Sequence, residues 1–414
     1  MISASLLGLL LLSIGESPLA RRRFGVSSHD PAATIAATPR LQTAFQVARM
    51  GLLWEGVERS PGIYDFARWD AWFASAPANA TGSYLILCYG NSLHTGGAAI
   101  APATPSAISA FVRFALAAMR RYRGRGVVWE LWNEPNGHQF WPGGPNASAY
   151  AALALALGRE MRAEPALRGE VLVGPAASQV DIPFIAAVQR AGGLRYMDAV
   201  SVHPYCFGGP EQRRASYSEL RRVTGSLPII AGEWGWSTCT NAATGAPARC
   251  VGGATADDNP VADQAAFLVR QYLVDAMEEV PISVWYDWAD GSNTTLGEQS
   301  FGVIHADGQP KPAFLAAQTL ERLLGSRAFV GRIDTGAADA NTSFVLNFSR
   351  GSDGRPDAIA SVIAVWSIDR SDGVSTVVGT GHEMVCRGKI RSGPMRNCSD
   401  ACRRTPLCRA FVSW

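Results

Sequence analysis

Short apolar runs alternate with helix-like stretches between about residues 23 and 324. The clearest helix is predicted for residues 106–122, where apolar side chains recur at helical spacing along one face and Gly124 follows. Further helices are expected at 147–162, 182–191, 262–279 and 311–324. The apolar runs that read as strands begin near Phe24, Arg49, Tyr84, Val127, Val171, Ala199, Pro228 and Ser283.

Strands and helices that alternate over this length are typical of a (β/α)₈ barrel, which needs about 250 residues. A doubly wound open sheet would give a similar pattern. However, the first strand lacks the G-x-G-x-x-G loop that a nucleotide-binding fold of that kind would carry. We therefore expect an α/β fold with a TIM barrel.

After Leu324 the pattern changes to short strand-like runs joined by Gly, Asp and Ser turns, and then to a cysteine-rich tail. This predicts a small β-rich domain followed by a short disulfide-rich segment. The expected divisions are a signal peptide at 1–20, the barrel at 21–324, the β domain at 325–380 and the tail at 381–414.

The amino terminus predicts export. Leu6 to Ile14 is a nine-residue apolar run, which suits a secretory signal and is too short to span a bilayer. A buried strand or helix start is the alternative, because no basic residue precedes the run. No later apolar run reaches 18 residues, so we predict no membrane span and a secreted, extracellular protein. Glycosylation acceptors support this route and occur at Asn79, Asn146, Asn293, Asn341, Asn347 and Asn397.

The eight cysteines fit an exported protein. Cys239 and Cys250 could close a Gly/Ala/Thr-rich loop, Cys88 is expected as a buried free thiol, and Cys206 is left open. A zinc site is less favoured, because no histidine or C-x-x-C pair has the usual spacing, so we expect no metal and no cofactor. Four cysteines that predict a local disulfide framework are Cys386, Cys398, Cys402 and Cys408.

Composition narrows the function classes. Charged residues make up 17% and hydrophobic residues 47% of the chain, which suits a large apolar core. The net charge of +2 gives no support to a nucleic-acid partner. Twelve tryptophans add some weight to a sugar-binding cleft, since sugars lie on flat aromatic faces, but core packing uses tryptophan as well.

Two segments carry the candidate chemistry. VVWELWNEPNGHQFW (127–141) and LPIIAGEWGWST (227–238) are each a hydrophobic strand that ends in a glutamate flanked by aromatic residues. Polar residues at the carboxyl ends of barrel strands are where catalysis occurs on this fold. If these are the fourth and seventh strands, Glu134 and Glu233 face one central cleft. An ordinary surface charge is the alternative, which the apolar neighbours of Glu134 oppose.

Paired carboxylates in a cleft suit acetal hydrolysis. One carboxyl group must be protonated to release the leaving oxygen, and the other must be ionised to attack the anomeric carbon. Two glutamates share these tasks only when their surroundings separate their pKa values.

At these residues the chain resembles a known group. WELWNEPN (129–136), together with AGEWGWS (231–237), resembles the clan A glycoside hydrolases over about residues 23–324. That group consists of retaining enzymes on (β/α)₈ barrels. The stretch WELWNEPNGHQFW is most similar to family 39, with family 5 as the alternative; the third strand, SYLILCYGN (83–91), lacks the histidine usual in family 5. The resemblance implies a glycosidase that cleaves a β-linked poly- or oligosaccharide through a covalent glycosyl-enzyme intermediate.

The resemblance also implies individual roles. Glu134 matches the acid/base and Glu233 the nucleophile, while Asn133 matches the residue that binds the sugar 2-hydroxyl. Arg49 matches an arginine that pairs with the nucleophile, although it could be an ordinary strand-end arginine. His203 and Tyr205 match the pair of strand six near the nucleophile; a core histidine is the alternative for His203.

An aromatic platform under the sugar is expected from the eighth strand. Trp285 and Trp288 are three residues apart and face opposite sides of a strand, so one of them can line the cleft, and we expect Trp285. His29 is a weaker candidate for a distal sugar contact. Trp54, Asn91, His94 and Asp290 lie at plausible cleft positions without an assigned role.

The tail resembles the start of a PAN/apple domain through its C-x₃-C and C-x₅-CRAF spacings, and such modules bind protein or glycan. A simple disulfide-stapled cap is the alternative. Two other functions share these residues: a non-catalytic carbohydrate-binding protein and a transglycosylase.

Overall fold

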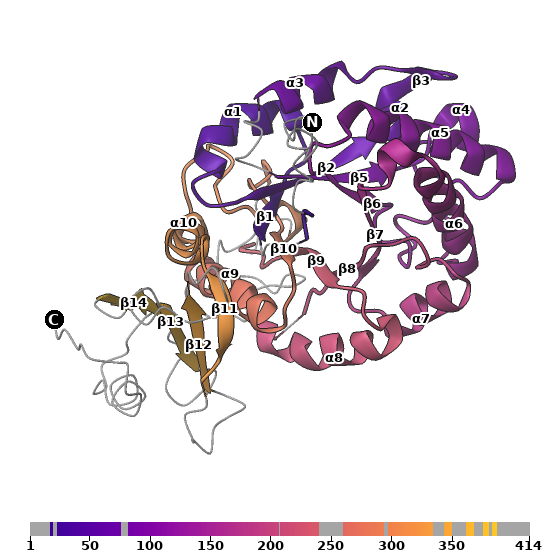
Figure 1. Ribbon diagram of the computed structural model, residues 1–414. Helices are drawn as coiled ribbons and strands as arrows, with labels where there is room; N and C mark the ends of the chain where they lie inside the picture. The colour runs from indigo at the N-terminus through magenta and orange to yellow at the C-terminus, as the bar shows by residue number, and fades with distance from the viewer. Residues whose placement is uncertain are drawn as a thin grey trace, which may run out of the picture.

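Eight parallel strands close into a barrel, which confirms the expected fold (Figure 1). The computed structural model describes residues 17–19, 23–75, 82–206, 208–239, 260–293, 297–333, 343–349, 362–367, 376–380 and 383–386. In barrel order the strands are β1 (Arg23–Ser27), β2 (Val47–Leu53), β5 (Gly82–Cys88), β6 (Val128–Leu131), β7 (Val171–Ser178), β8 (Ala199–His203), β9 (Ile229–Trp234) and β10 (Ile282–Trp285).

Helices form a ring around the strands (Figure 1). Their amino ends are capped by short polar side chains: Thr104, Asn146 and Asp181 each accept a hydrogen bond from a backbone N–H of the helix that follows. The ring contains α1 (Pro31–Leu41), α3 (Ala67–Ser75), α5 (Pro105–Tyr122), α6 (Ala147–Ala163), α7 (Ile182–Arg190), α8 (Arg213–Thr224), α9 (Pro260–Met277) and α10 (Pro312–Leu324).

Shorter elements lie in the connections. The β2–α3 connection holds the hairpin β3 (Glu58–Ser60) and β4 (Ile63–Tyr64). The others are α2 (Trp54–Val57), α4 (Ser92–Thr95), η1 (Pro165–Leu167), η2 (Pro210–Gln212) and η3 (Gly297–Gln299).

Side chains inside the barrel form layers, because every second residue of a strand points inward. One buried cluster is apolar and covers two successive inward positions on β7 and β10; it contains Val47, Tyr84, Val128, Val171, Val173, Ala199, Ile230, Ile282 and Val284. The inward residues two positions further along four of these strands are Arg49, Glu130, Ser201 and Gly232. Strand periodicity thus places a polar layer between the apolar floor and the carboxyl ends of the strands.

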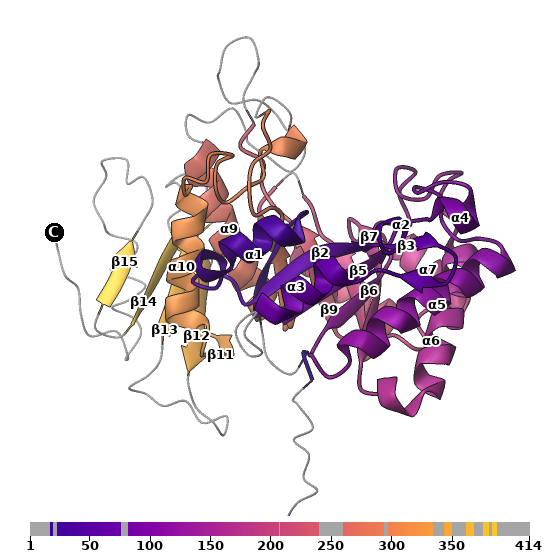
Figure 2. The same ribbon diagram turned by 90° about the horizontal axis from the view of Figure 1, so that it is seen from above.

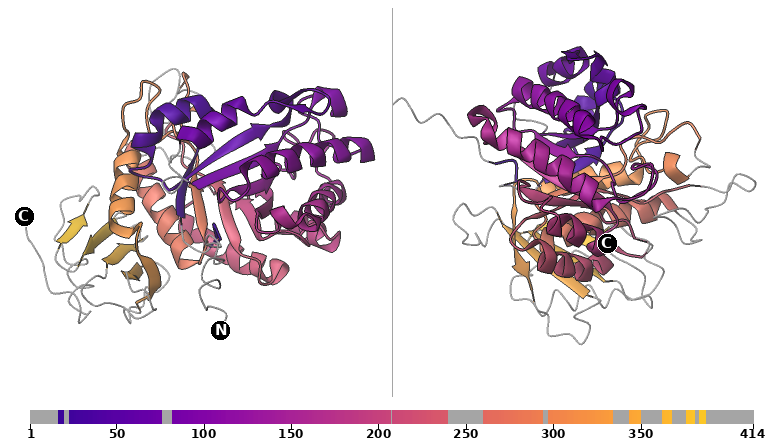
Figure 3. Two further views of the ribbon diagram at one scale, coloured as in Figure 1. Left: turned by 45° about the horizontal axis from the view of Figure 1, so that its top comes forward. Right: turned by 90° about the vertical axis from the view of Figure 1, so that its right-hand side faces the viewer.

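A five-stranded antiparallel sheet follows the barrel and lies beside α9 and α10 (Figures 2 and 3). A buried contact joins the two parts: the Trp366 Nε1 donates to Oε1 of Glu211 at 2.7 Å, and Glu211 is paired with Arg270. The strands are β11 (Ala328–Arg332), β12 (Ser343–Ser349), β13 (Val362–Ser367), β14 (Thr376–Thr380) and β15 (Glu383–Cys386), so the sheet passes the expected boundary at residue 380.

Cys88 and Cys206 are buried free thiols, as expected for Cys88. Cys239 is disulfide-bonded, but its pairing with Cys250 stays a prediction because Cys250 lies outside the described residues. Residues 1–16 and 20 of the predicted signal peptide, the tail from residue 387 and the acceptors Asn79, Asn341 and Asn397 also lie outside them. Within the described part of the chain, no helix is long and apolar enough to cross a membrane.

Candidate active site

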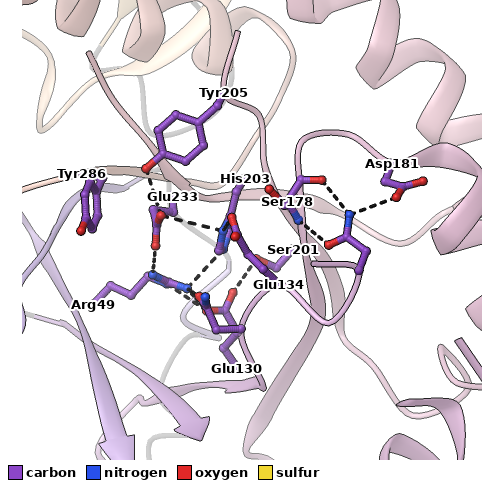
Figure 4. Close-up of polar contacts among 12 residues, drawn as sticks. Arg49, Glu130, Glu134, Ser178, Asp181, Ser201, His203, Tyr205, Glu233 and Tyr286 are labelled. Carbon is purple, nitrogen blue, oxygen red and sulfur yellow. Dashed lines mark hydrogen bonds and ion pairs between the residues drawn. The ribbon is translucent and has the colours of Figure 1, made fainter. Parts of the chain in front are cut away.

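Four barrel strands bring five side chains together in the upper part of the barrel: Arg49 from within β2, Asn133 and Glu134 after β6, His203 from the end of β8 and Glu233 from β9 (Figure 4). Counted around the barrel, β6 is the fourth strand and β9 the seventh. The structure therefore gathers residues that are far apart in the sequence.

The backbone after β6 is shaped to present Glu134. Trp132 and Glu134 have φ angles of 67° and 44°, in the left-handed region that residues other than glycine rarely adopt. Such a conformation costs about 1–3 kcal/mol and persists only where the surroundings hold it. Here the Trp132 N–H donates to the carbonyl of Leu87 and the Glu134 N–H to that of Ala176, on either side of β6.

An irregularity in β9 aims Glu233 inward. Ser283 of β10 is opposite Ala231, but Trp285 is opposite Trp234, so β9 contains one extra residue between these pairs. A β-bulge of this kind breaks the strict alternation of side chains. It allows Glu233 to join the barrel interior although its neighbour Gly232 also faces inward.

Both oxygens of Glu233 accept hydrogen bonds. Arg49 Nη1 donates to Oε2 at 2.6 Å, and the Tyr205 hydroxyl donates to Oε1 at 2.9 Å. Burial raises the pKa of Tyr205 well above its usual value, so the phenol keeps its proton and remains a donor. The Glu233 side chain is 14% exposed and is open to a ligand.

Glu134 is held by His203, whose Nδ1 lies 2.8 Å from its Oε1. Arg49 Nη2 lies 3.2 Å from the other ring nitrogen, Nε2. Because a guanidinium can only donate, Nε2 accepts, and the ring proton is on Nδ1 and is directed at Glu134. Burial raises the pKa of Glu134, but the hydrogen bond and charge of His203, the hydrogen bond from Ser178 and the charge of Arg49 together outweigh it, so the net shift is downward.

The two carboxyl groups lie close together. One ligand atom from each of Glu134, His203 and Glu233 falls within 4.8 Å of the other two. This is the group of His, Cys, Asp or Glu residues among those described that could hold a metal ion. Its carboxylates already accept hydrogen bonds from Arg49, Tyr205 and His203, and the adjacent guanidinium repels a cation.

Asn133 is buried and fixed by the same arginine. Arg49 Nη2 donates to its Oδ1 at 2.9 Å, so the amide nitrogen Nδ2 is the end that points away from Arg49. The structure therefore brings Arg49, Asn133, His203 and Tyr205 together around the two glutamates, and their roles stay predictions.

Glu130 is a residue of this cluster that sequence analysis missed. It is 0% exposed, and Arg49 donates to its Oε2 from Nε at 2.8 Å and from Nη2 at 2.6 Å. Burial would raise its pKa, but Arg49 and other partners hold the pKa below the usual value. A charged residue in the middle of the apolar run VVWELW, two positions after Val128, was the signal that could have identified it.

The expected cleft position of Trp285 is corrected by the structure. Trp285 is 0% exposed, donates from Nε1 to the carbonyl of Phe301 and packs against Phe267 of α9, so it lies on the outer face of β10. Its neighbours Val284 and Tyr286 take the inward positions. Figure 4 shows Tyr286 beside Glu233 and Arg49. Trp288 packs against Phe314 of α10.

The weaker candidates separate into two groups. His29 lies at the rim, with Nε2 3.1 Å from Asp287 and its ring edge-on to Tyr286. The hydrogen bond to Asp287 raises the pKa of His29. The other four make buried structural contacts: Asn91 donates to the Glu58 carbonyl, Trp54 and His94 stack and contact the Glu58 carboxylate, and Asp290 pairs with Lys311.

Comparisons with known proteins agree with this fold. No protein-family model and no curated protein matches the chain. A family 39 glycoside hydrolase from the gut symbiont Bacteroides cellulosilyticus WH2 is similar in structure, with a TM-score of 0.63 and 22% identity over 88% of this chain and 74% of that one.

Two further solved structures are similar at lower identity. A GH39 β-xylosidase from Caulobacter crescentus has a TM-score of 0.58 and 17% identity, covering 84% of this chain and 77% of its own. A GH5_18 protein from Streptomyces cattleya has a TM-score of 0.56 and 18% identity, covering 73% and 80%. The chain therefore shares the (β/α)₈ barrel fold of these proteins.

Proposed function

We propose that this protein is a retaining glycoside hydrolase that works through a covalent glycosyl-enzyme intermediate. The observation that carries the proposal is the pair of glutamates, Glu134 and Glu233, at the carboxyl ends of the fourth and seventh strands, with separate hydrogen-bond partners. The similarity to solved glycoside hydrolases adds support at the level of fold.

In the first step, Glu233 attacks the anomeric carbon of the sugar. A bond forms between a Glu233 oxygen and this carbon, and the bond to the leaving oxygen breaks. Glu134 gives its proton to the leaving oxygen. Arg49 and Tyr205 orient the attacking carboxylate.

In the second step, Glu134 takes a proton from water while the water oxygen attacks the same carbon. The bond to Glu233 breaks, and Glu233 leaves as a carboxylate with Arg49 beside it. Glu134 ends the cycle protonated. Because the pKa of Glu134 is lowered in the free protein, Glu134 holds this proton only at acidic pH.

The separation of the carboxyl groups supports retention. Retaining enzymes hold the two groups about 5–5.5 Å apart, whereas inverting enzymes leave about 6.5–9.5 Å for a water molecule. One carboxylate oxygen of Glu134 and one of Glu233 lie within 4.8 Å of each other, which is closer to the arrangement of retaining enzymes.

A β-linked oligo- or polysaccharide is the proposed substrate. Proteins of similar structure include a β-xylosidase, an exo-β-1,4-mannosidase and an endo-β-1,4-xylanase. The free amide nitrogen of Asn133 is placed to donate to a sugar hydroxyl, and Tyr286 takes the aromatic position expected of Trp285.

Azide chemistry tests the two roles separately. A panel of 2,4-dinitrophenyl β-glycosides first identifies a sugar that the protein cleaves. In Glu233→Ala, azide replaces the nucleophile in a single displacement, so the glycosyl azide has inverted configuration. In Glu134→Ala, azide attacks the glycosyl-enzyme, so its product has retained configuration.

Glu170→Gln is the matched control, because Glu170 is a buried glutamate that accepts from Gly124 and Trp129 and has no contact with the pair. It should keep wild-type turnover and form no azide product. Full activity of Glu233→Ala would refute the assignment of the nucleophile.

We also propose that the protein is secreted, which rests on the apolar amino terminus and on the glycosylation acceptors. Two of these, Asn146 and Asn293, are exposed. A shift in mass after peptide-N-glycosidase treatment of protein from eukaryotic culture medium tests this.

The tail is proposed as a PAN/apple-like segment that contacts protein or glycan.

A further inference from the structure

Arg49 lies between the buried carboxylate of Glu130 and the partly exposed carboxylate of Glu233. Its Nε and Nη2 both donate to Oε2 of Glu130, at 2.8 and 2.6 Å, and its Nη1 donates to Oε2 of Glu233 at 2.6 Å. Arg49 is 3% and Glu130 0% exposed, so water screens their charges poorly. One cation therefore faces two anions.

Glu130 is ionised and fully bonded. Its second oxygen, Oε1, accepts from the Tyr84 hydroxyl and from Ser201 Oγ, both at 2.6 Å. With the two donors of Arg49, four hydrogen bonds hold this carboxylate. Because it has no exposed surface, Glu130 cannot touch a substrate and cannot be a catalytic residue.

Gly232 leaves space for this cluster because it has no side chain. A Cβ atom at Gly232 would lie 2.4 Å from Ser201 Oγ, 3.0 Å from Glu130 Oε1 and 3.2 Å from the Tyr84 hydroxyl. Contacts under 3.0 Å require a shift of the surrounding atoms. The residue before Glu233 therefore leaves room for Glu130 and its donors.

We propose that Glu130 is a positioning residue that shares the charge of Arg49 and so sets how strongly this cation acts on Glu134 and Glu233. With Glu130 present, Arg49 and Glu130 form a nearly neutral pair beneath the site. Without it, both glutamates face an uncompensated guanidinium. This proposal rests on the proposed function, because the effect of Glu130 on Glu134 and Glu233 matters for glycoside cleavage only if these two glutamates are catalytic.

The direction of the effect follows from the charges. An uncompensated cation favours the ionised form of each nearby carboxyl group. Glu134 would then hold its proton only at lower pH, and Glu233 would be a poorer nucleophile because its negative charge would be stabilised before attack. Both changes slow the first step near neutral pH.

The test is Glu130→Gln, which keeps an acceptor oxygen for Arg49 and removes the charge. The pH profile of kcat/KM is measured on a 4-nitrophenyl glycoside that the wild type cleaves. We expect both limbs of the profile to move to lower pH by about one unit or more. Activity at pH 7 should fall at least tenfold.

Glu170→Gln is the control for loss of a buried carboxylate, and its limbs should stay at the wild-type pH. Unchanged limbs in Glu130→Gln would overturn the proposal. A shift of the limbs to higher pH would also overturn it, because it would mean that Arg49 no longer faces the carboxylates.

A second variant covers the case in which Glu130→Gln does not fold. The double variant Arg49→Gln/Glu130→Gln removes both charges, and we expect it to recover soluble folded protein. If Glu130→Gln is unfolded and the double variant is equally unfolded, charge sharing is refuted.

A measurement that needs no substrate distinguishes failure of the charge-sharing proposal from failure of the proposed function. If the wild type cleaves no glycoside, the proposed function fails, but the carboxyl groups can still be titrated by ¹³C NMR with [δ-¹³C]glutamate. Resonances are assigned with Glu134→Gln and Glu233→Gln. In Glu130→Gln the Glu134 resonance should titrate at lower pH than in the wild type; an unchanged or higher titration point would refute charge sharing.

Discussion

His203 is the residue that connects Arg49 to Glu134. Its Nε2 accepts from the arginine and its Nδ1 donates to the carboxylate, so the ring cannot turn without losing one of these bonds. The imidazole therefore acts on Glu134 in a fixed orientation. Its hydrogen bond is the largest of the contributions that lower the pKa of Glu134.

Removing this imidazole should move the pH range of the reaction. In His203→Ala, Glu134 loses its strongest donor, so its pKa rises and it keeps its proton to higher pH. The basic limb of the kcat/KM profile, measured with a 4-nitrophenyl glycoside, should shift upward. His94→Ala, which changes a histidine that contacts Glu58 instead, should leave the limb in place. A limb that stays or moves downward in His203→Ala would contradict this account.

Trp285 and Tyr286 are adjacent but face opposite sides of the barrel wall, so their substitutions should separate stability from substrate binding. Trp285→Ala should lower the free energy of unfolding in urea by about 3–5 kcal/mol, because it empties a buried site. Tyr286→Ala should lower kcat/KM about tenfold or more at a smaller cost in stability. Equal losses of activity and stability in both variants would argue against this division.

At the scale of the element, sequence patterns predicted the strands better than the helices. Each barrel strand is a buried apolar run, which is visible without knowledge of its neighbours. The helices α1, α3 and α8 were not predicted; α8 (RRASYSELRRVT) is strongly polar, and α1 contains Pro39. Such helices are stabilised mainly by packing of a narrow buried face, which in α8 consists of Tyr217, Leu220 and Thr224.

The details that aim the site residues could not be predicted, because they depend on pairing between strands. The bulge in β9 is defined only by its register against β10, and the φ angles of Trp132 and Glu134 depend on carbonyls of β5 and β7. Glu134 and Glu233 were predicted because a glutamate among aromatic residues at a strand end is conspicuous. Trp285 was wrongly expected in the cleft. Neighbouring residues of a strand face opposite sides, and Val284, the residue before it, faces the barrel interior.

The β9 strand gives a prediction of its own. Gly232→Ala places a methyl group 2.4 Å from Ser201 Oγ, so we expect a loss of about 1–3 kcal/mol in unfolding free energy and a larger loss of turnover, because Glu233 is the next residue. Removing the nearest atom in Gly232→Ala/Ser201→Gly should recover part of the stability. Gly169→Ala, where a Cβ meets nothing within 4 Å, is the neutral control. No loss of turnover in Gly232→Ala would refute the tight fit.

At the scale of the whole molecule, stability should depend on a carboxyl group remote from the site. Asp275 of α9 is buried and accepts from the Tyr217 hydroxyl of α8 at 2.9 Å. Burial raises its pKa from 3.8 to about 7. Between these pH values the folded protein binds a proton that the unfolded chain has released, so the free energy of unfolding falls as pH rises.

Asp275→Asn removes this dependence. The wild type should lose stability progressively from about pH 4 to pH 7, by up to about 4 kcal/mol, whereas the variant should give a flatter curve and be more stable than the wild type at pH 8. Urea unfolding at a series of pH values measures this. Asp198→Asn, at a half-exposed partner of Arg162, is the control for loss of an acidic side chain. A wild-type curve that rises over this range would refute the assignment.

The contact between Trp366 and Glu211 has a consequence for how the protein can be divided. Glu211 belongs to the same β8–α8 loop as Tyr205, and two partners hold it: Arg270 of α9 and the indole of the carboxyl-terminal sheet. A barrel cut after Leu324 would leave an apolar wall uncovered and one hydrogen bond of this carboxylate unmade. The sheet thus helps to fix the β8–α8 loop, whose Tyr205 donates to the Glu233 carboxylate. We expect a truncated barrel to be less soluble and less active than the full chain.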